Sequence, residues 1–135
     1  MAYMSQERKA EIAPVVKKIL GRYGLKGSLR VRNHSTLCLT IRSGSIDFIA
    51  NHVETMGRDH TDYFAWGADR GNIDVNVYHY RNQFDGRARD ALAELINAMN
   101  QGNYDNSQIE YDYFDRGWYV DVEIGRWNRP YALEK

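Results

Sequence analysis

The chain has 135 residues, 43% of them hydrophobic and 13% aromatic, and only two are proline. That is enough apolar surface to bury one core without a metal or a disulfide, so we expect a single domain over residues 1–135. Cys38 is the only cysteine, which excludes an intrachain disulfide framework. The first residues of the chain carry charges where a secretory signal would have its apolar centre. No run in the sequence approaches the ~18 apolar residues of a membrane span. We therefore expect a cytoplasmic protein with no membrane partner.

The 18 basic and 18 acidic residues cancel but are unevenly distributed along the chain. Residues 1–44 hold nine Lys or Arg against two Glu, residues 45–102 hold five against nine acids, and residues 103–135 hold four against seven. The balances are therefore +7, −4 and −3. A chain that was basic throughout would indicate nucleic acid and one that was acidic throughout a DNA mimic, and neither extreme is present.

The first 44 residues predict a helix and a hairpin. Ser5 is expected to cap a helix that ends at Gly24 and that is kinked or divided at Pro14. Its apolar positions keep helical spacing: Ile12, Val16, Ile19, Leu20 and Tyr23. Residues 28–44 then alternate between apolar and polar side chains and turn at residues 33–35, which predicts a hairpin. Its outer face carries Arg30, Arg32, Thr40 and Arg42.

The middle of the chain predicts two more helices and one strand. Ser45 is expected to start a helix through Val53, and Ile73, Val75 and Val77 alternate as a strand. Residues 57–72 give no assignment. The clearest helix then runs from a cap at Asp85 to Gly102. Its apolar stripe consists of Ala88, Ala91, Leu92, Leu95, Ile96 and Met99.

Residues 103–127 predict a second hairpin, with its turn at residues 116–117. Its inner face carries Ile109, Tyr111, Tyr113, Trp118, Val120, Val122 and Ile124. The element order is therefore α-β-β-α-β-α-β-β. Because hairpins dominate, we expect an α+β fold in which helices cover one face of an antiparallel sheet of two hairpins plus one strand.

The second hairpin would carry four carboxylates on its outer face. The predicted turn places Asp112 opposite Asp121 and Glu110 opposite Glu123, and such like-charge pairs reduce stability. They suit an acid–base site or a cation site. The alternative, which we favour, is that cations of the first hairpin cover them, within one chain or between two copies. Arg30, Arg32 and Arg42 are the candidates.

Four aromatic residues are expected outside the core: Phe114, Tyr119, Trp127 and Tyr131. Aromatic residues mixed with arginine at a surface are typical of protein-recognition sites. The alternative is a C-terminal tail folded back over the sheet edge, with the ring of Trp127 packed against the helix.

The motifs of common catalytic and cofactor sites are missing. The histidines and the cysteine, at positions 34, 38, 52, 60 and 79, match no zinc-ligand spacing. Cys38 lies in a predicted strand without a placed histidine, and no nucleophile elbow or phosphate-binding loop is present. We expect no metal, no cofactor and no catalytic residue.

Nucleic acid is the principal alternative partner. The basic residues of the first third would form a patch for phosphate contacts: Lys17, Lys18, Arg22, Lys26, Arg30, Arg32 and Arg42. Aromatic rings that stack on bases usually lie among such cations, and here they cluster in the acidic third.

Two segments resemble a known family. Residues 26–49, "KGSLRVRNHSTLCLTIRSGSIDFI", and residues 103–131, "NYDNSQIEYDYFDRGWYVDVEIGRWNRPY", look like one of the large polyvalent protein-associated domain families, the class numbered twenty-nine. The resemblance is poor over residues 50–82. It implies a small accessory protein of a phage or another mobile element, acting in the host cytoplasm, and it carries over no catalytic residue.

Together these features indicate a non-enzymatic domain that binds a host or phage protein, or a second copy of itself. Takeover of host machinery or anti-defence activity would fit the ecology of such a family.

Overall fold

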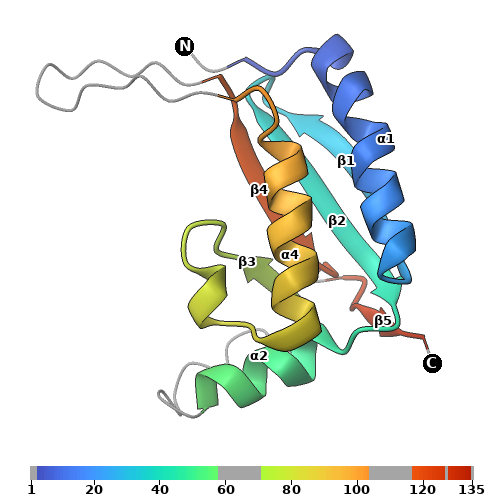
Figure 1. Ribbon diagram of the computed structural model, residues 1–135, viewed down its shortest axis with the longest axis vertical. Coiled ribbons are helices and arrows are strands. Elements are labelled where there is room, and N and C mark those ends of the chain that lie inside the picture. The colour runs from blue at the N-terminus through green and yellow to red at the C-terminus, as the bar shows by residue number, and fades with distance from the viewer. Residues whose placement is uncertain (1–2, 58–70, 104–116, 127, 135) are drawn as a thin grey trace, which may run out of the picture.

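The computed structural model describes residues 3–57, 71–103, 117–126 and 128–134. In chain order the elements are α1 (Gln6–Arg22), β1 (Leu25–Arg32), β2 (Thr36–Gly44), α2 (Phe48–Gly57), β3 (Ile73–Val75), a 3-10 turn η1 (Tyr80–Asn82), α4 (Gly86–Met99), β4 (Tyr119–Ile124) and β5 (Ala132–Leu133). Figure 1 shows α1 and α4 in front of the sheet and α2 across its lower end. The predicted α+β class, with helices on one face of the sheet, is confirmed.

The first helix forms at its predicted cap. The Ser5 hydroxyl oxygen accepts a hydrogen bond from the Arg8 backbone N–H at 3.0 Å, and α1 then runs without interruption through Pro14. The predicted division at this proline was wrong, because Ile12 and Val16, on either side of it, are both buried and hold the helix against the sheet.

The first hairpin turns where its sequence indicates. Asn33 and His34 both have positive φ, 54° and 58°, and the Ser35 N–H donates to the Arg32 carbonyl at 3.3 Å. Two successive residues in the left-handed region match the twist of the flanking strands. The turn therefore aligns Arg30 with Cys38 on the outer face of the sheet.

The sheet is mixed, so the prediction of a purely antiparallel sheet was wrong. The strand order is β1-β2-β4-β3, and β5 pairs with the end of β2. β1–β2 and β3–β4 are antiparallel, whereas β2–β4 and β2–β5 are parallel. A parallel pair needs a long crossover, which α2, β3 and α4 provide. Residues 104–116, which include the first arm of the predicted second hairpin, lie outside the described residues.

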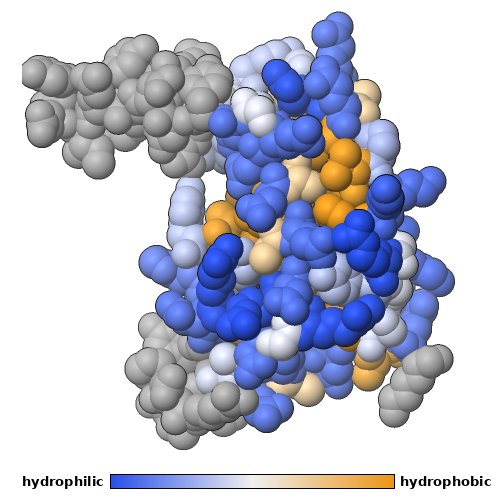
Figure 2. Space-filling model, viewed as in Figure 1, coloured by the Kyte–Doolittle hydropathy of each residue, from blue (hydrophilic) through white to orange (hydrophobic). Residues whose placement is uncertain are grey.

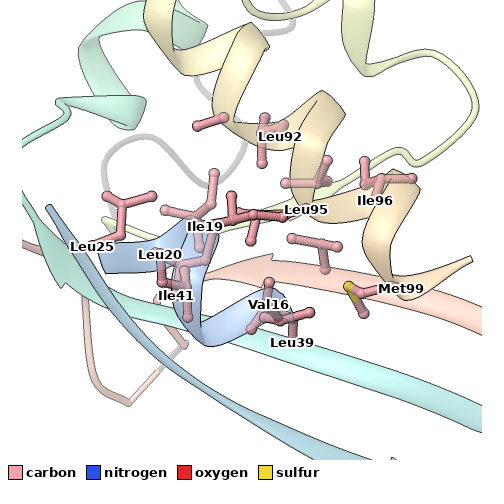
Figure 3. Close-up of a cluster of buried hydrophobic side chains, with 14 of the residues drawn as sticks. Val16, Ile19, Leu20, Leu25, Leu39, Ile41, Leu92, Leu95, Ile96 and Met99 are labelled. Carbon is pink, nitrogen blue, oxygen red and sulfur yellow. The ribbon is translucent and has the colours of Figure 1, made fainter. Parts of the chain in front are cut away.

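The core fills the space between the two long helices and the sheet. Figure 3 shows Val16 and Leu20 of α1 and Leu95 and Met99 of α4 above Leu39 of β2. The predicted apolar stripe of α4 is buried along its whole length. No described helix has both the length and the apolarity to cross a membrane.

Two element boundaries differ from the prediction. α2 begins at Phe48 with Asp47 as its cap, whose carboxylate accepts from the Ala50 N–H at 3.0 Å. The predicted cap, Ser45, instead donates its hydroxyl to the Tyr23 carbonyl. β3 ends at Val75, and Val77 lies in the turn that follows.

A reciprocal hydrogen-bond pair joins α2 to the start of α4. The Asn51 amide donates to the Asp85 carbonyl at 3.0 Å and accepts from the Asp85 N–H at 2.9 Å. One side chain thereby satisfies both backbone groups of the residue that precedes α4.

We expect Asn51→Ala to lower the free energy of unfolding by about 1–3 kcal/mol, because it leaves two partly buried backbone groups without these partners. Urea denaturation measures the change. Asn97→Ala is the matched control, since Asn97 is exposed on α4 and the same substitution there should have an effect within about 0.5 kcal/mol. Equal effects of the two substitutions would contradict the structural role of Asn51.

Candidate binding surface

The outer face of the sheet lies opposite α1 and α4, behind the sheet in Figure 1. Because side chains alternate along a strand, the register places charged and polar residues of four strands in rows on this face. One row joins Arg30, Cys38 and Asp121, and the next joins Ser28, Thr40, Glu123 and Asp74.

Arginines of β1 reach across β2 to the carboxylates of β4. Arg32 Nη2 lies 2.9 Å from Asp121 Oδ2, and Arg30 Nη2 lies 3.3 Å from Glu123 Oε1. The Thr40 hydroxyl also donates to Glu123 at 2.6 Å. The prediction that arginines of the first hairpin cover these acids is therefore confirmed for Arg30 and Arg32, and the pairing occurs within one chain.

The only cysteine of the sequence lies in the sheet among the residues of these ion pairs. Cys38 lies between Arg30 of β1 and Asp121 of β4 in the sheet and is 2% exposed. Burial raises the pKa of the Cys38 thiol. A protonated, buried thiol is a poor nucleophile.

Asp74 is a member of this face that the sequence analysis did not identify. It is the direct partner of Glu123 across the β3–β4 ladder. Desolvation and the neighbouring Asp121 and Glu123 raise the pKa of the Asp74 carboxyl, although the side chain keeps contact with solvent. The alternation of Ile73 and Val75 already placed Asp74 outward, but nothing in the sequence indicated which strand would lie beside it.

The aromatic residues predicted at the surface differ in their placement. Tyr119 is 44% exposed on the outer face, as expected. Tyr131 is only 9% exposed, its hydroxyl donates to the Ile46 carbonyl at 2.6 Å, and its ring packs edge-on against Phe48. Burial raises the pKa of Tyr131 to about 12. For Tyr131 the structure matches the alternative of a tail that folds back, because Ala132 and Leu133 pair with the end of β2.

Four predicted site residues lie outside the described residues, two from the aromatic set and two from the acidic set: Phe114, Trp127, Glu110 and Asp112. The like-charge neighbour that the sheet gives Glu123 is Asp74.

A groove of about 820 Å³ opens between the ends of β1 and β2 and the segment that leads to β5. Four cationic side chains and one acidic side chain line it: Lys26, Arg42, Arg126, Arg129 and Glu134. The rest of its lining consists of small or polar residues and Pro130, with no aromatic ring among the described ones.

The cations of the groove differ in how far they are neutralised. Lys26 pairs with Glu134 at 3.3 Å, and Arg126 pairs with Glu123 at 3.2 Å. Arg42 and Arg129 are both exposed and form no ion pair or hydrogen bond with any described side chain. Sequence reasoning included Arg42 but missed Arg126 and Arg129, which lie in the acidic third and come beside Arg42 only through the fold.

The basic residues predicted as one nucleic-acid patch lie on two sides of the sheet. Lys17, Lys18 and Arg22 belong to α1, which covers the inner face, whereas Arg30 and Arg42 lie on the outer side. Arg22 is also paired with Glu94 at 2.6 Å. Figure 2 shows the helical face as mostly hydrophilic, with apolar residues visible in a few separate patches.

The described histidines do not assemble with other ligands. His52 is buried beside Phe84, its Nδ1 lies 3.2 Å from the Gln83 carbonyl, and burial lowers its pKa. Within the part of the chain that the structure describes, no group of three or more His, Cys, Asp or Glu could hold a metal ion.

The ion pair between Arg32 and Asp121 generates a charge-swap prediction. Arg32→Glu should lower the free energy of unfolding by about 1 kcal/mol, because it replaces an attraction with a repulsion, and adding Asp121→Lys should restore most of the loss. Thermal denaturation of the single and double variants measures the coupling. Strictly additive effects would show that the two side chains do not interact.

Asp74 generates a prediction about pH. Its pKa is raised above the ordinary value of 3.8, so the unfolded chain releases this proton at a lower pH than the native protein does. The native protein therefore binds more protons over this range, and stability falls as pH rises through it. Asp74→Asn should raise the free energy of unfolding at pH 7 by about 0.2–1 kcal/mol, and the gain should disappear below the ordinary pKa of Asp.

Denaturation at several pH values tests this, with Asp90→Asn, at an exposed position of α4, as the control. A variant at position 74 that is no more stable than the parent at pH 7 would contradict the repulsion.

The chain was compared with protein-family models, with curated proteins and with solved structures, and none of these comparisons found a match.

Proposed function

We propose that this protein is a non-catalytic binding domain that uses its basic groove and the adjoining outer face of the sheet to engage an acidic surface of another protein. The groove consists of the cations Lys26, Arg42, Arg126 and Arg129 with Glu134 at its rim.

The observation that carries this proposal is the pair of exposed arginines without described partners. Arg30 and Arg32 are held by carboxylates of their own chain, whereas Arg42 and Arg129 line an open concave surface and keep all their donors available among the described residues. A guanidinium presents five donors in a planar fork that matches a carboxylate. Two of them in one groove favour an anionic partner.

The ion pairs formed by the carboxylates of β4 support a binding role over a catalytic one. Asp121 and Glu123, proposed from the sequence as an acid–base alternative, are engaged with Arg32 and Arg30. The described lining of the groove contains no histidine or cysteine that would act as base or nucleophile. Tyr119, exposed on the same face of the sheet, adds an aromatic ring of the kind enriched in protein interfaces.

The biological setting rests on the resemblance of residues 26–49 and 103–131 to a large polyvalent protein-associated domain family. From it we infer an accessory protein of a phage or mobile element that binds a host or phage protein in the host cytoplasm, with takeover of host machinery or anti-defence as the outcome. This part of the proposal does not depend on the groove.

Nucleic acid is the second candidate, since the same four cations would also contact phosphates. The described groove lining lacks the aromatic rings on which unpaired bases stack, so this candidate is restricted to backbone contacts. The two candidates differ in their response to nuclease.

We expect Arg42→Glu combined with Arg129→Glu to remove partner binding, because the substitutions turn two cations of the groove into anions. Affinity capture of tagged protein from bacterial lysate, divided into nuclease-treated and untreated halves, provides the measurement. A partner retained by the parent in both halves should be reduced at least about tenfold with the variant, the loss that corresponds to one charged contact.

Lys18→Glu combined with Arg89→Glu is the matched control, because it changes the net charge equally at exposed positions on α1 and α4. It should leave capture unchanged. A groove variant that still captures the partner would overturn the proposal, and enrichment that disappears with nuclease would replace it with the nucleic-acid candidate.

A further inference from the structure

We propose that the free edge of β1 is a docking site at which an extended, acidic segment of a partner protein adds to the sheet as a further strand. Among the described residues, β1 is the end strand of the sheet and pairs with β2 on one side only. Apart from β2, the only described backbone group bonded to β1 is the Ser35 N–H of the hairpin turn, which binds the Arg32 carbonyl. The other side of β1 therefore offers N–H and C=O groups to an incoming strand.

A groove runs beside this edge, between α1 and β1. It has a volume of about 380 Å³ and is lined by Lys9, Ala13, Val16, Lys17, Leu20, Gly27, Ser28, Leu29 and Leu39. Most of its surface is apolar, and Leu29 of β1 is only partly buried. Side chains of an added strand alternate between two faces, so every second one would enter this groove beneath α1.

The charges around the edge select the composition of the segment. Lys9 and Lys17 are the charged residues among those that line the groove. On the opposite face of β1, the Arg30 and Arg32 side chains remain 39% and 48% exposed even though each pairs with a carboxylate of β4. A strand added here would have its second set of side chains beside these arginines. An alternation of apolar and acidic residues therefore fits both faces.

The same charges disfavour a second copy of this chain as the occupant. In an antiparallel pair of β1 strands that keeps the apolar faces together, positions 26, 28, 30 and 32 of one copy lie opposite the same set in the other. Three of these positions carry Lys or Arg and one carries Ser. Every such register of useful length brings cations directly opposite each other, which opposes a homodimer through this edge.

A bulge limits where the segment pairs. The β1–β2 register shifts between Lys26 and Gly27, where β2 contains the extra residue Arg42, and from Gly27 to Arg32 it is uninterrupted. The bulge increases the local twist, and an edge lysine such as Lys26 discourages strand addition, so the protected part of β1 is its beginning. The second half, next to Leu29 and Val31, is the part open to pairing.

This inference goes beyond the basic groove assigned above, because strand addition at β1 does not require Arg42 or Arg129. The two proposals can therefore be tested separately. The groove variant Arg42→Glu with Arg129→Glu should bind a ligand of the β1 edge as the parent does.

The probe is a blocked synthetic peptide of about seven residues, a typical strand length, that alternates Glu and Val. We expect saturable binding to the full chain with a dissociation constant below about 1 mM, and amide chemical-shift changes concentrated in β1 and α1. A peptide that alternates Lys and Val should bind at least about tenfold more weakly, since its cations meet Arg30, Arg32 and the lysines of the groove.

Two variants test the two features of the site. Lys9→Glu combined with Lys17→Glu should weaken binding at least about tenfold, while Lys18→Glu combined with Arg89→Glu should leave it nearly unchanged because these charges lie away from the groove. Ala13→Phe should fill the groove and abolish binding, and an unchanged circular dichroism spectrum would show that the variant is folded.

Three results would overturn the proposal. Chemical-shift changes centred on Arg42 and Arg129 would show that the peptide binds in the basic groove and not at the edge of β1. Equal binding of the two peptides would show that charge does not select the ligand. A concentration-dependent dimer of the parent that is disrupted by Ala13→Phe would assign the edge to a second copy.

Discussion

The parallel pairing of β4 with β2 is the constraint on which the rest of this structure depends. It aligns Val120, Val122 and Ile124 with Leu37, Leu39 and Ile41 to form the inner face that α1 and α4 cover. The same register aligns Asp121 with Cys38 and Glu123 with Thr40 on the outer face. The two carboxylates of β4 are thus separated from Arg30 and Arg32 of β1 only by β2. One pairing thus provides both the core and the ion pairs, and a shift by one residue would exchange the two faces of β4.

β4 is held at its start by side chains that bond to the backbone, and the chain beyond its end is held by a backbone hydrogen bond. At its start, the Asn103 amide exchanges two hydrogen bonds with the Trp118 backbone, and the Trp118 indole N–H donates to the Met99 carbonyl at the end of α4. Beyond its end, Gly125 adopts φ 70° and the Tyr131 N–H bonds to the Gly71 carbonyl. An added Cβ at Gly125 would lie 2.5 Å from the Tyr131 nitrogen, so the chain can fold back here only with glycine. That close approach is what buries the Tyr131 ring.

Alternation and helical spacing predicted the elements well, because each depends on neighbours within a few residues. The cap at Ser5, the hairpin turn at residues 33–35, the stripe of α4 and the inward face of β4 all have local signals. Strand order has none. Nothing near Asp74 or Arg129 in the sequence indicates that the first lies beside Glu123 and the second beside Arg42. For the same reason Tyr131 looked like a surface residue, since its burial depends on Ile46 and Phe48, which lie more than 80 positions earlier.

Long-range contacts explain the uneven distribution of charge along the sequence. The excess of cations in residues 1–44 meets acids far along the chain, through the pairs Arg22–Glu94, Lys26–Glu134, Arg30–Glu123 and Arg32–Asp121. Each of these pairs is partly exposed and adds little stability alone, about 0–1 kcal/mol. Their larger consequence is to determine which cations remain unpaired among the described residues. Arg42 and Arg129 in the basic groove, and Lys9 and Lys17 beside the edge of β1, are such cations. A chain whose charges sum to zero thus keeps two cationic surfaces, one on the outer face of the sheet and one at its edge, and each is suited to an acidic partner.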